Sequence, residues 1–127
     1  MKIVGKHIAV VGASNNPKKY GNKVIKAVSK ITGTVFPVNL KEREIFGKKV
    51  FASVNDIQSK LDVIVFVVPP VVTLSVLESI KNKQAHFWFQ PGSFNNKVIH
   101  YCKKNKLSFT NNLCIIVESE RIFAHEN

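Results

Sequence analysis

The residues with the clearest chemical potential lie in one turn, Gly12–Lys19 (GASNNPKK), which follows an apolar run and precedes a helical pattern. Turns of this kind bind phosphate groups, because backbone amides are free at a helix start and the helix dipole favours an anion. Ser14 adds a hydroxyl donor, and Lys18 and Lys19 add two cations for phosphate oxygens. The turn therefore predicts a site for a phosphate-bearing ligand.

The same turn departs from the dinucleotide-binding fingerprint G-x-G-x-x-G. Gly12 matches the first glycine, but Ser14 stands at the second position and Pro17 at the third. The second glycine allows a pyrophosphate to approach the backbone, and the third allows the helix to pack closely on the strand. The pattern G-x-x-x-x-G-K-[ST] is also absent, because Gly21 lies too far from Gly12. These departures favour a phosphate-bearing ligand other than NAD.

A second chemical signal follows the next expected strand, in the segment PVNLKER. NAD sites place an acidic residue here to hold the ribose diol, whereas a phosphorylated ribose favours a cation. In this chain Asn39 and Lys41 come first, and the first acidic residue is Glu42. A ligand with a phosphate on its ribose therefore fits better than NAD.

Residues for catalysis are few. Ser14 has no His or Asp nearby in the sequence to activate it. Cys102 and Cys114 carry thiols that could exchange with another thiol or react with an acyl group. Their apolar neighbours favour core packing for Cys102 and a buried strand end for Cys114. Asp62 opens an expected core strand and is interpreted as a turn residue. Catalysis is thus left open, with binding alone the preferred interpretation.

These residues must be positioned by strands and helices that alternate along the chain. Short apolar, β-branched runs predict strands at 7–12, 33–39, 62–68, 85–90 and 107–112. Helical spacing of apolar residues predicts helices at 20–31, 71–83 and 94–106, with one or two helical turns at 54–61. Residues 113–119 fit neither pattern clearly. The alternation predicts a Rossmann-like α/β fold: a doubly wound, mainly parallel sheet of five or six strands with helices on both faces.

In such a sheet, ligands bind beyond the carboxyl ends of the strands, near the switch in strand order. The loops expected at that edge carry most of the unusual polar residues of the chain. They are 12–21, 39–41, 69–71, 90–93 and 111–114. We therefore predict one site at this edge.

Composition narrows the class of protein. A length of 127 residues with 45% hydrophobic content predicts one domain over residues 1–127 with a packed core. The longest apolar run, 63–72, contains two prolines and is too short to span a bilayer, and the first residues turn polar too quickly for a secretory signal. We expect a cytoplasmic protein without membrane association. The two cysteines and four scattered histidines form no metal-binding pattern, so no metal is expected.

The net charge of +11 suits nucleic acid, an anionic membrane or a phosphorylated small molecule. Residues 1–60 hold twelve Lys and Arg against three acidic residues, and the rest of the chain holds seven against five. The chain lacks an Arg-rich tract and helix-turn-helix spacing, and Trp88 and Phe89 fall in an expected core strand. Nucleic-acid binding is therefore the weaker interpretation.

Five segments in register also resemble a known family. They are IAVVGASNNPKKYGNKVIKAV, VFPVNLKEREIFGKKVFASVNDI, DVIVFVVPP, FWFQPGSFNN and NNLC. Their order and spacing over about residues 5–117 are similar to those of the small stand-alone CoA-binding proteins. These in turn resemble the N-terminal CoA-binding domain of the succinyl-CoA synthetase α subunit. The resemblance implies a Rossmann-like fold and coenzyme A (CoA) or an acyl-CoA as the ligand.

The resemblance also implies residue roles. Gly12, Ala13 and Ser14 would contact the CoA phosphates through backbone amides and the hydroxyl, and Lys18 or Lys19 would pair with phosphate. Residues lining the nucleotide would be Pro37, Val38 and Asn39, with Lys41 reaching the ribose phosphate. Residues bounding the adenine or pantetheine part would be Val68 and Pro69, then Gln90, Pro91 and Gly92. Cys114 matches a cysteine common near the end of the family pattern.

Two hypotheses of function remain. The first is a non-catalytic binding or regulatory module for CoA or an acyl-CoA, which could present its ligand to a protein partner or form a homodimer. The second is an NADP-binding oxidoreductase or redox regulator, because the ribose phosphate of NADP would also suit Lys41. The first is favoured by the length of the resemblance. The histidine that the synthetases phosphorylate lies in a separate domain, so binding is expected without that chemistry.

Overall fold

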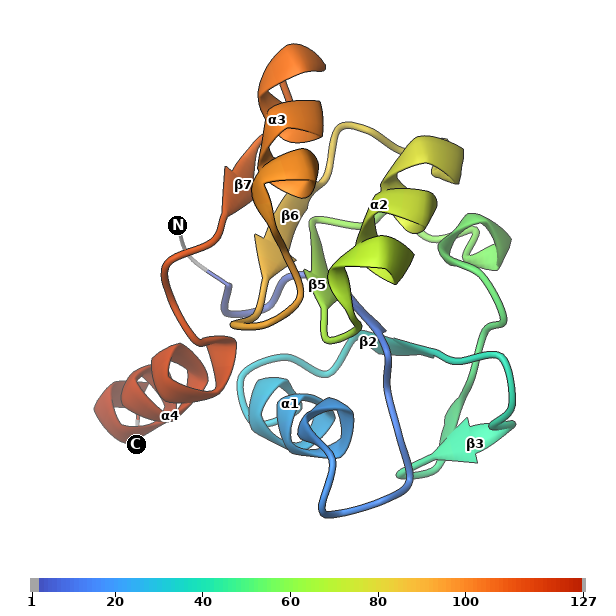
Figure 1. Ribbon diagram of the computed structural model, residues 1–127. Coiled ribbons are helices and arrows are strands. Elements are labelled where there is room, and N and C mark those ends of the chain that lie inside the picture. Colours follow the sequence, from blue (N-terminus) through green and yellow to red (C-terminus); the bar gives the residue numbers. More distant parts are fainter. Residues whose placement is uncertain (1–2, 127) are drawn as a thin grey trace.

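Strands and helices alternate along the chain in the computed structural model, which describes residues 3–126 (Figure 1). The main sheet is formed by β1 (Ile8–Val11), β2 (Val35–Val38), β5 (Val63–Phe66), β6 (His86–Phe89) and β7 (Phe109–Thr110). The helices are α1 (Tyr20–Val28), α2 (Pro70–Ser79), α3 (Asn96–Lys104) and α4 (Ile115–Glu126). Between β2 and β5 lie a hairpin, β3 (Glu44–Ile45) with β4 (Lys48–Lys49), and a 3-10 turn, η1 (Val54–Asp56).

The main sheet has the strand order β2-β1-β5-β6-β7, and all its neighbouring strands are parallel. After β2 the chain crosses back to the other side of β1 and continues through β5. The switch in strand order therefore lies between β1 and β5. This arrangement confirms the predicted Rossmann-like, doubly wound sheet, with five strands.

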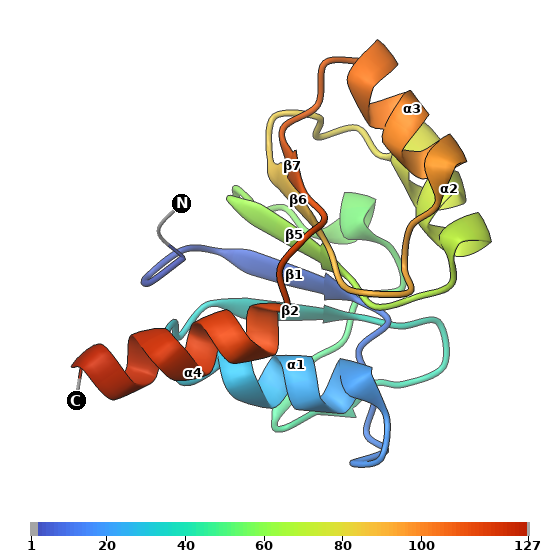
Figure 2. The same ribbon diagram turned by 60° about the vertical axis from the view of Figure 1, so that its left-hand side comes forward.

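Alternate side chains of the strands serve two cores, one on each face of the sheet. In β1, Ala9 and Val11 pack on the face covered by α2 and α3, whereas Ile8 and Val10 pack on the face covered by α1 and α4. Figure 2 shows these two helix pairs on opposite sides of the sheet. Since both faces are covered, the central strands are apolar throughout rather than alternating.

Two segments form elements that the sequence did not predict, and a third differs in length from its prediction. Residues 115–126 form α4, which packs beside α1, although the run Ile115–Val117 has the β-branched character of a strand. Packing of Ile115 in the core overrides that local preference. The hairpin β3–β4 was not expected; it turns at Phe46 and Gly47, which both have positive φ angles. The expected helix at 71–83 is shorter, because α2 ends at Ser79.

None of the helices within residues 3–126 is both long and apolar enough to cross a membrane.

Candidate ligand site

Two cavities lie side by side at the carboxyl edge of the sheet, with volumes of about 780 Å³ and 440 Å³. Gly12, Asn39 and Val68 line both of them, so the two cavities adjoin each other, and together they are called the cleft. Gly12 follows β1, and Val68 follows β5, which places the cleft at the switch in strand order. This is the position predicted from the order of the elements.

The larger cavity has one strongly cationic wall. Lys18, Lys19, Tyr20 and Gly21 line it at the start of α1. No side chain within residues 3–126 caps this helix start, and its first turn holds no acidic residue. Free amides of a helix N-terminus beside two lysines make this wall suited to an anion.

The packing of α1 on β1 depends on two glycines. Gly12 has φ +99°, and a Cβ there would lie 2.7 Å from the carbonyl oxygen of Val67. A Cβ at Gly21 would overlap the carbonyl oxygen of Gly12. Gly21 therefore performs the close helix-to-strand packing that the third fingerprint glycine performs elsewhere. Matching the sequence to the G-x-G-x-x-G fingerprint did not reveal this role, because the loop between Gly12 and Gly21 is longer than the fingerprint allows. The sequence feature that could have indicated this packing is the glycine at the second position of the helix.

Asn39 connects the end of β2 to the turn 12–19 that follows β1. Its Nδ2 donates to the carbonyl oxygen of Ala13 at 2.8 Å. Its Oδ1 accepts the backbone N–H groups of Lys41 at 2.7 Å and Glu42 at 3.1 Å. Asn39 thus has a positioning role as well as a place on the cleft surface, and it orders the backbone that carries Lys41.

The carboxylate of Glu42 accepts a hydrogen bond from the turn 12–19. Asn15 Nδ2 donates to Glu42 Oε2 at 2.6 Å and to the carbonyl oxygen of Glu44 at 2.8 Å. Glu42 lines neither cavity, whereas Lys41 lines the smaller one. The charge that this segment offers to a ligand is therefore positive.

The smaller cavity is mainly apolar. Its walls come from the end of β2, from η1 and from α2, and its apolar lining residues include Val38, Val54, Val68, Val72, Val76 and Ile80. Asn39, Lys41, Ser53 and Ser75 add polar groups. A flat ring with polar edges suits such a space. The sequence did not indicate the walls from η1 and α2, because they meet only when the crossover between β2 and β5 folds back.

Gln90 connects the loop after β6 to the start of α4. Its side chain is 3% exposed, and its Oε1 accepts the backbone N–H of Ile115 at 2.7 Å. Its Nε2 donates to the Sγ atom of Cys114 at 3.4 Å. Cys114 therefore lies half-buried at a helix start on the larger cavity, and the expectation of a buried strand end is wrong.

The other residues that the sequence predicted for the site also meet here, except two. Ala13 and Pro37 are buried and line neither cavity. The N–H groups of Gly12 and Ala13 donate to the carbonyl oxygen of Val38, at 3.1 Å and 3.3 Å. Donors that face the larger cavity are then the Ser14 hydroxyl, the lysines and the first turn of α1. The hydroxyl oxygen of Ser14 also accepts the N–H of Asn16 at 3.0 Å.

The described histidines and acidic residues lie away from the cleft. His86 contacts Ser108 Oγ at 2.6 Å and Thr110 Oγ1 at 2.7 Å, and burial lowers its pKa. Asp62 accepts the backbone N–H of His7 at 2.8 Å, as expected of a turn residue. Residues 3–126 contain no group of three His, Cys, Asp or Glu side chains placed to hold a metal ion.

The two thiols should differ strongly in reactivity. Cys102 is fully buried, and burial raises its pKa to about 11, so about one thousandth of it is thiolate at about pH 8. Cys114 faces the cleft. We expect iodoacetamide to modify Cys114 first, and Cys114→Ser to leave the folded protein almost unreactive, as measured by intact mass. Equal labelling of both thiols in the folded protein would contradict this.

Several known proteins are similar in sequence to this chain. A sequence profile described as a CoA binding domain matches residues 6–120. The chain is 38% identical over 78 residues to an ADP-forming acetate–CoA ligase of Methanocaldococcus jannaschii, covering 61% of this chain and 11% of the ligase. It is 46% identical over 63 residues to the alpha subunit of an ADP-forming acetate–CoA ligase II of Pyrococcus furiosus, covering 49% and 14%. The chain thus spans a small part of the length of these relatives.

A solved structure matches over a much larger share. The structure of a conserved hypothetical protein from Pyrococcus furiosus superimposes with a TM-score of 0.83 at 41% identity. The match covers 89% of this chain and 98% of that chain. The fold described above is therefore shared over nearly the whole of both proteins.

Proposed function

This chain belongs to the CoA-binding domain family, and from that premise we propose that it binds coenzyme A or an acyl-CoA in the cleft, as a non-catalytic binding or regulatory module. The observation that carries the proposal is that the two cavities adjoin each other at Gly12, Asn39 and Val68. CoA has an adenine ring, a phosphorylated ribose, a pyrophosphate and a long pantetheine arm. The cleft offers matching surroundings in the same order. They are the apolar smaller cavity, Lys41 at its edge, the cationic start of α1, and the loop 90–93 beside Cys114.

The parts of the ligand are assigned to the cleft as follows. Adenine occupies the smaller cavity, and the ribose phosphate meets Lys41 at its edge. The pyrophosphate lies against Ser14, Lys18 and Lys19 beside the start of α1. The pantetheine arm runs past the loop 90–93 toward Cys114.

Binding without catalysis is supported by the chemistry of the cleft. None of the described histidines and acidic residues lines either cavity, so the side chains that most often transfer protons at neutral pH are not on its surface. The ligases named above are much longer than this chain, and their activity belongs to the whole proteins.

A ligand panel tests the proposal. Calorimetric titration should give the tightest binding for CoA and acetyl-CoA, weaker binding for dephospho-CoA, and weaker binding still for NAD. NADP shares a phosphorylated ribose but lacks the pantetheine arm, so it should bind less tightly than CoA. Tighter binding of NADP than of CoA would overturn the proposal in favour of an oxidoreductase or redox regulator.

Replacing Lys41 tests the assigned orientation. Lys41→Ala should weaken CoA binding about tenfold, since it removes a charge-assisted contact to phosphate, and should leave dephospho-CoA binding unchanged. Lys49→Ala is the matched control, because Lys49 is exposed on the neighbouring hairpin and lines neither cavity. Equal losses for CoA and dephospho-CoA in the Lys41 variant would remove the ribose-phosphate role.

A further inference from the structure

Glu42, the first acidic residue after β2, is bound by the turn 12–19 instead of facing the cleft. Asn15 Nδ2 donates to Glu42 Oε2 at 2.6 Å and to the carbonyl oxygen of Glu44 at 2.8 Å. Both hydrogens of one amide group are therefore engaged by the segment that begins at Glu42. Neither Asn15 nor Glu42 lines a cavity of the cleft, whereas Lys41 lines the smaller one.

Asn15 is a firmly placed donor, because the backbone before and after it is anchored. Before it, Asn39 Nδ2 donates to the carbonyl oxygen of Ala13 at 2.8 Å. After it, Asn22 Nδ2 donates to the carbonyl oxygen of Ser14 at 3.1 Å. Asn22 belongs to α1 and is 7% exposed, so this second bond is buried. The amide of Asn15 is thus presented at a fixed place by two other parts of the fold.

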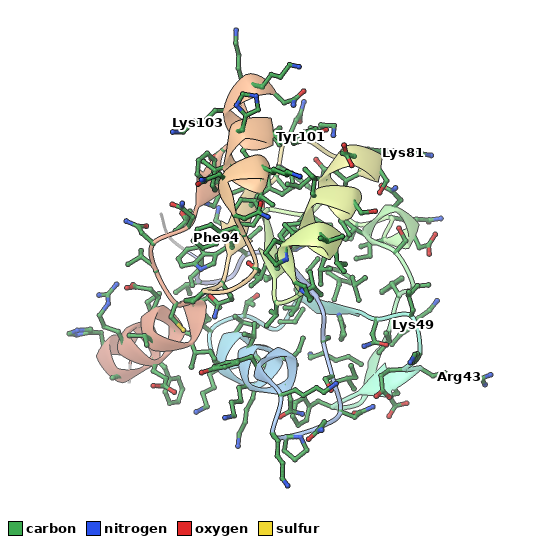
Figure 3. The ribbon with its side chains drawn as sticks, in the orientation of Figure 1. Arg43, Lys49, Lys81, Phe94, Tyr101 and Lys103 are labelled. Carbon is green, nitrogen blue, oxygen red and sulfur yellow. The ribbon has the colours of Figure 1, made fainter. Side chains whose placement is uncertain are left out.

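The carboxylate of Glu42 is not held by a cation. No Lys or Arg among residues 3–126 forms an ion pair with it. Arg43, the next residue, is exposed and extends outward beside the hairpin in Figure 3. Lys49 Nζ lies 5.2 Å from the centre of the Phe51 ring instead. The position of the Glu42 carboxylate therefore depends on its hydrogen bond with Asn15.

The place of Glu42 in the chain gives this hydrogen bond a consequence for the ligand. Glu42 directly follows Lys41, and Asn39 Oδ1 accepts the backbone N–H groups of both residues, at 3.1 Å and 2.7 Å. In dinucleotide sites, an acidic side chain after the second strand accepts hydrogen bonds from the hydroxyls of an unphosphorylated ribose. The same carboxylate repels a phosphate on the ribose, because both groups are anions.

We propose that the hydrogen bond between Asn15 and Glu42 determines the preference of the cleft for a phosphorylated ribose over an unphosphorylated one. The inference rests on the proposed function, which places the ribose phosphate of CoA beside Lys41. While Asn15 holds the carboxylate of Glu42, the ribose phosphate meets the lysine alone. Without Asn15, rotation of the Glu42 side chain brings its carboxylate toward the ribose, where it opposes the phosphate. Asn15 acts through Glu42 and is a positioning residue.

Replacing Asn15 tests the inference through a ratio of two affinities. In calorimetric titrations, Asn15→Ala should lower the ratio of CoA affinity to dephospho-CoA affinity about fivefold, since a freed surface charge opposes the phosphate that only CoA carries. Asn15→Leu has a side chain of similar size without a donor, and it should give the same fall. Asn15 is exposed, so both variants should keep the fold, which circular dichroism checks.

Removing the charge should rescue the preference. Glu42→Gln keeps an oxygen that accepts from Asn15, so this variant should discriminate at least as well as the natural chain. When Asn15→Ala is combined with Glu42→Gln, the freed side chain is neutral, and the ratio should return to its natural value. Asn16→Ala is the matched control: Asn16 is exposed in the same turn, and its Oδ1 accepts the backbone N–H of Lys18 at 2.9 Å. Disturbing that turn should affect both ligands alike and leave the ratio unchanged.

The outcomes separate this inference from the proposed function. A natural chain that binds neither CoA nor dephospho-CoA, or binds both equally, would overturn the proposed ribose-phosphate contact and the inference together. A natural chain that prefers CoA, with an unchanged ratio in Asn15→Ala, would leave the proposed function in place and overturn the inference alone. A double variant whose ratio stays low would also overturn it, since Asn15 would then shape the turn rather than hold a charge.

Discussion

Gly21→Ala should destabilise the folded chain by about 3 kcal/mol. The added Cβ would overlap the carbonyl oxygen of Gly12 and lie 2.9 Å from its carbonyl carbon. Both are backbone atoms at the end of β1, so no side-chain rotation relieves the overlap. α1 would have to move away from the sheet, and Val24 and Ile25, which are fully buried, would lose packing.

Urea unfolding followed by circular dichroism measures this loss, and CoA titration of the same variant should show weakened binding, because the start of α1 lines the larger cavity. Gly33→Ala is the control. An added Cβ at Gly33 meets no atom within 4 Å, so its stability should match the natural chain or exceed it slightly. Equal stability of both variants would show that α1 does not pack on Gly12 through Gly21.

Reversing two charges at the cleft should have the largest effect on binding. Lys18→Glu with Lys19→Glu replaces two cations on the larger cavity by two anions, which would repel the pyrophosphate. We expect CoA affinity to fall at least about 100-fold. Both side chains are exposed, so stability should change little.

The control must carry the same change in net charge. Lys26→Glu with Lys60→Glu does so at two exposed positions that line neither cavity. It should reduce affinity only slightly, through the weaker long-range field. Titration at low and high salt sharpens the test, since CoA affinity of the natural chain should fall with salt more steeply than that of the cleft variant. Similar losses in both double variants would assign the effect to net charge rather than to the cleft.

Local sequence patterns were sufficient to predict the sheet and the edge at which the cleft lies. Apolar runs such as 62–68 indicated the strands. Their alternation with helices indicated a parallel sheet, because each helix forms a crossover connection between parallel strands, and such crossovers are right-handed. The turn 12–19, Asn39, Lys41 and Gln90 therefore had to meet at one edge, and the structure brings them together there. The family resemblance drawn from five motifs was likewise confirmed by the match over residues 6–120.

Only the tertiary structure decided the features that depend on distances between remote segments. The contact of Gly21 with Gly12, the turn of Glu42 toward Asn15 and the helix at residues 115–126 are of this kind. Each of these three features is fixed by packing or by a hydrogen bond between segments distant in the sequence. The local conformational preference of the residues involved either does not favour the feature or opposes it. The sequence alone thus determined which loops form the cleft, because periodicity and connection rules act locally. The tertiary structure determined which atoms face the cleft, because close backbone approach and side-chain pairing arise only after those loops are assembled.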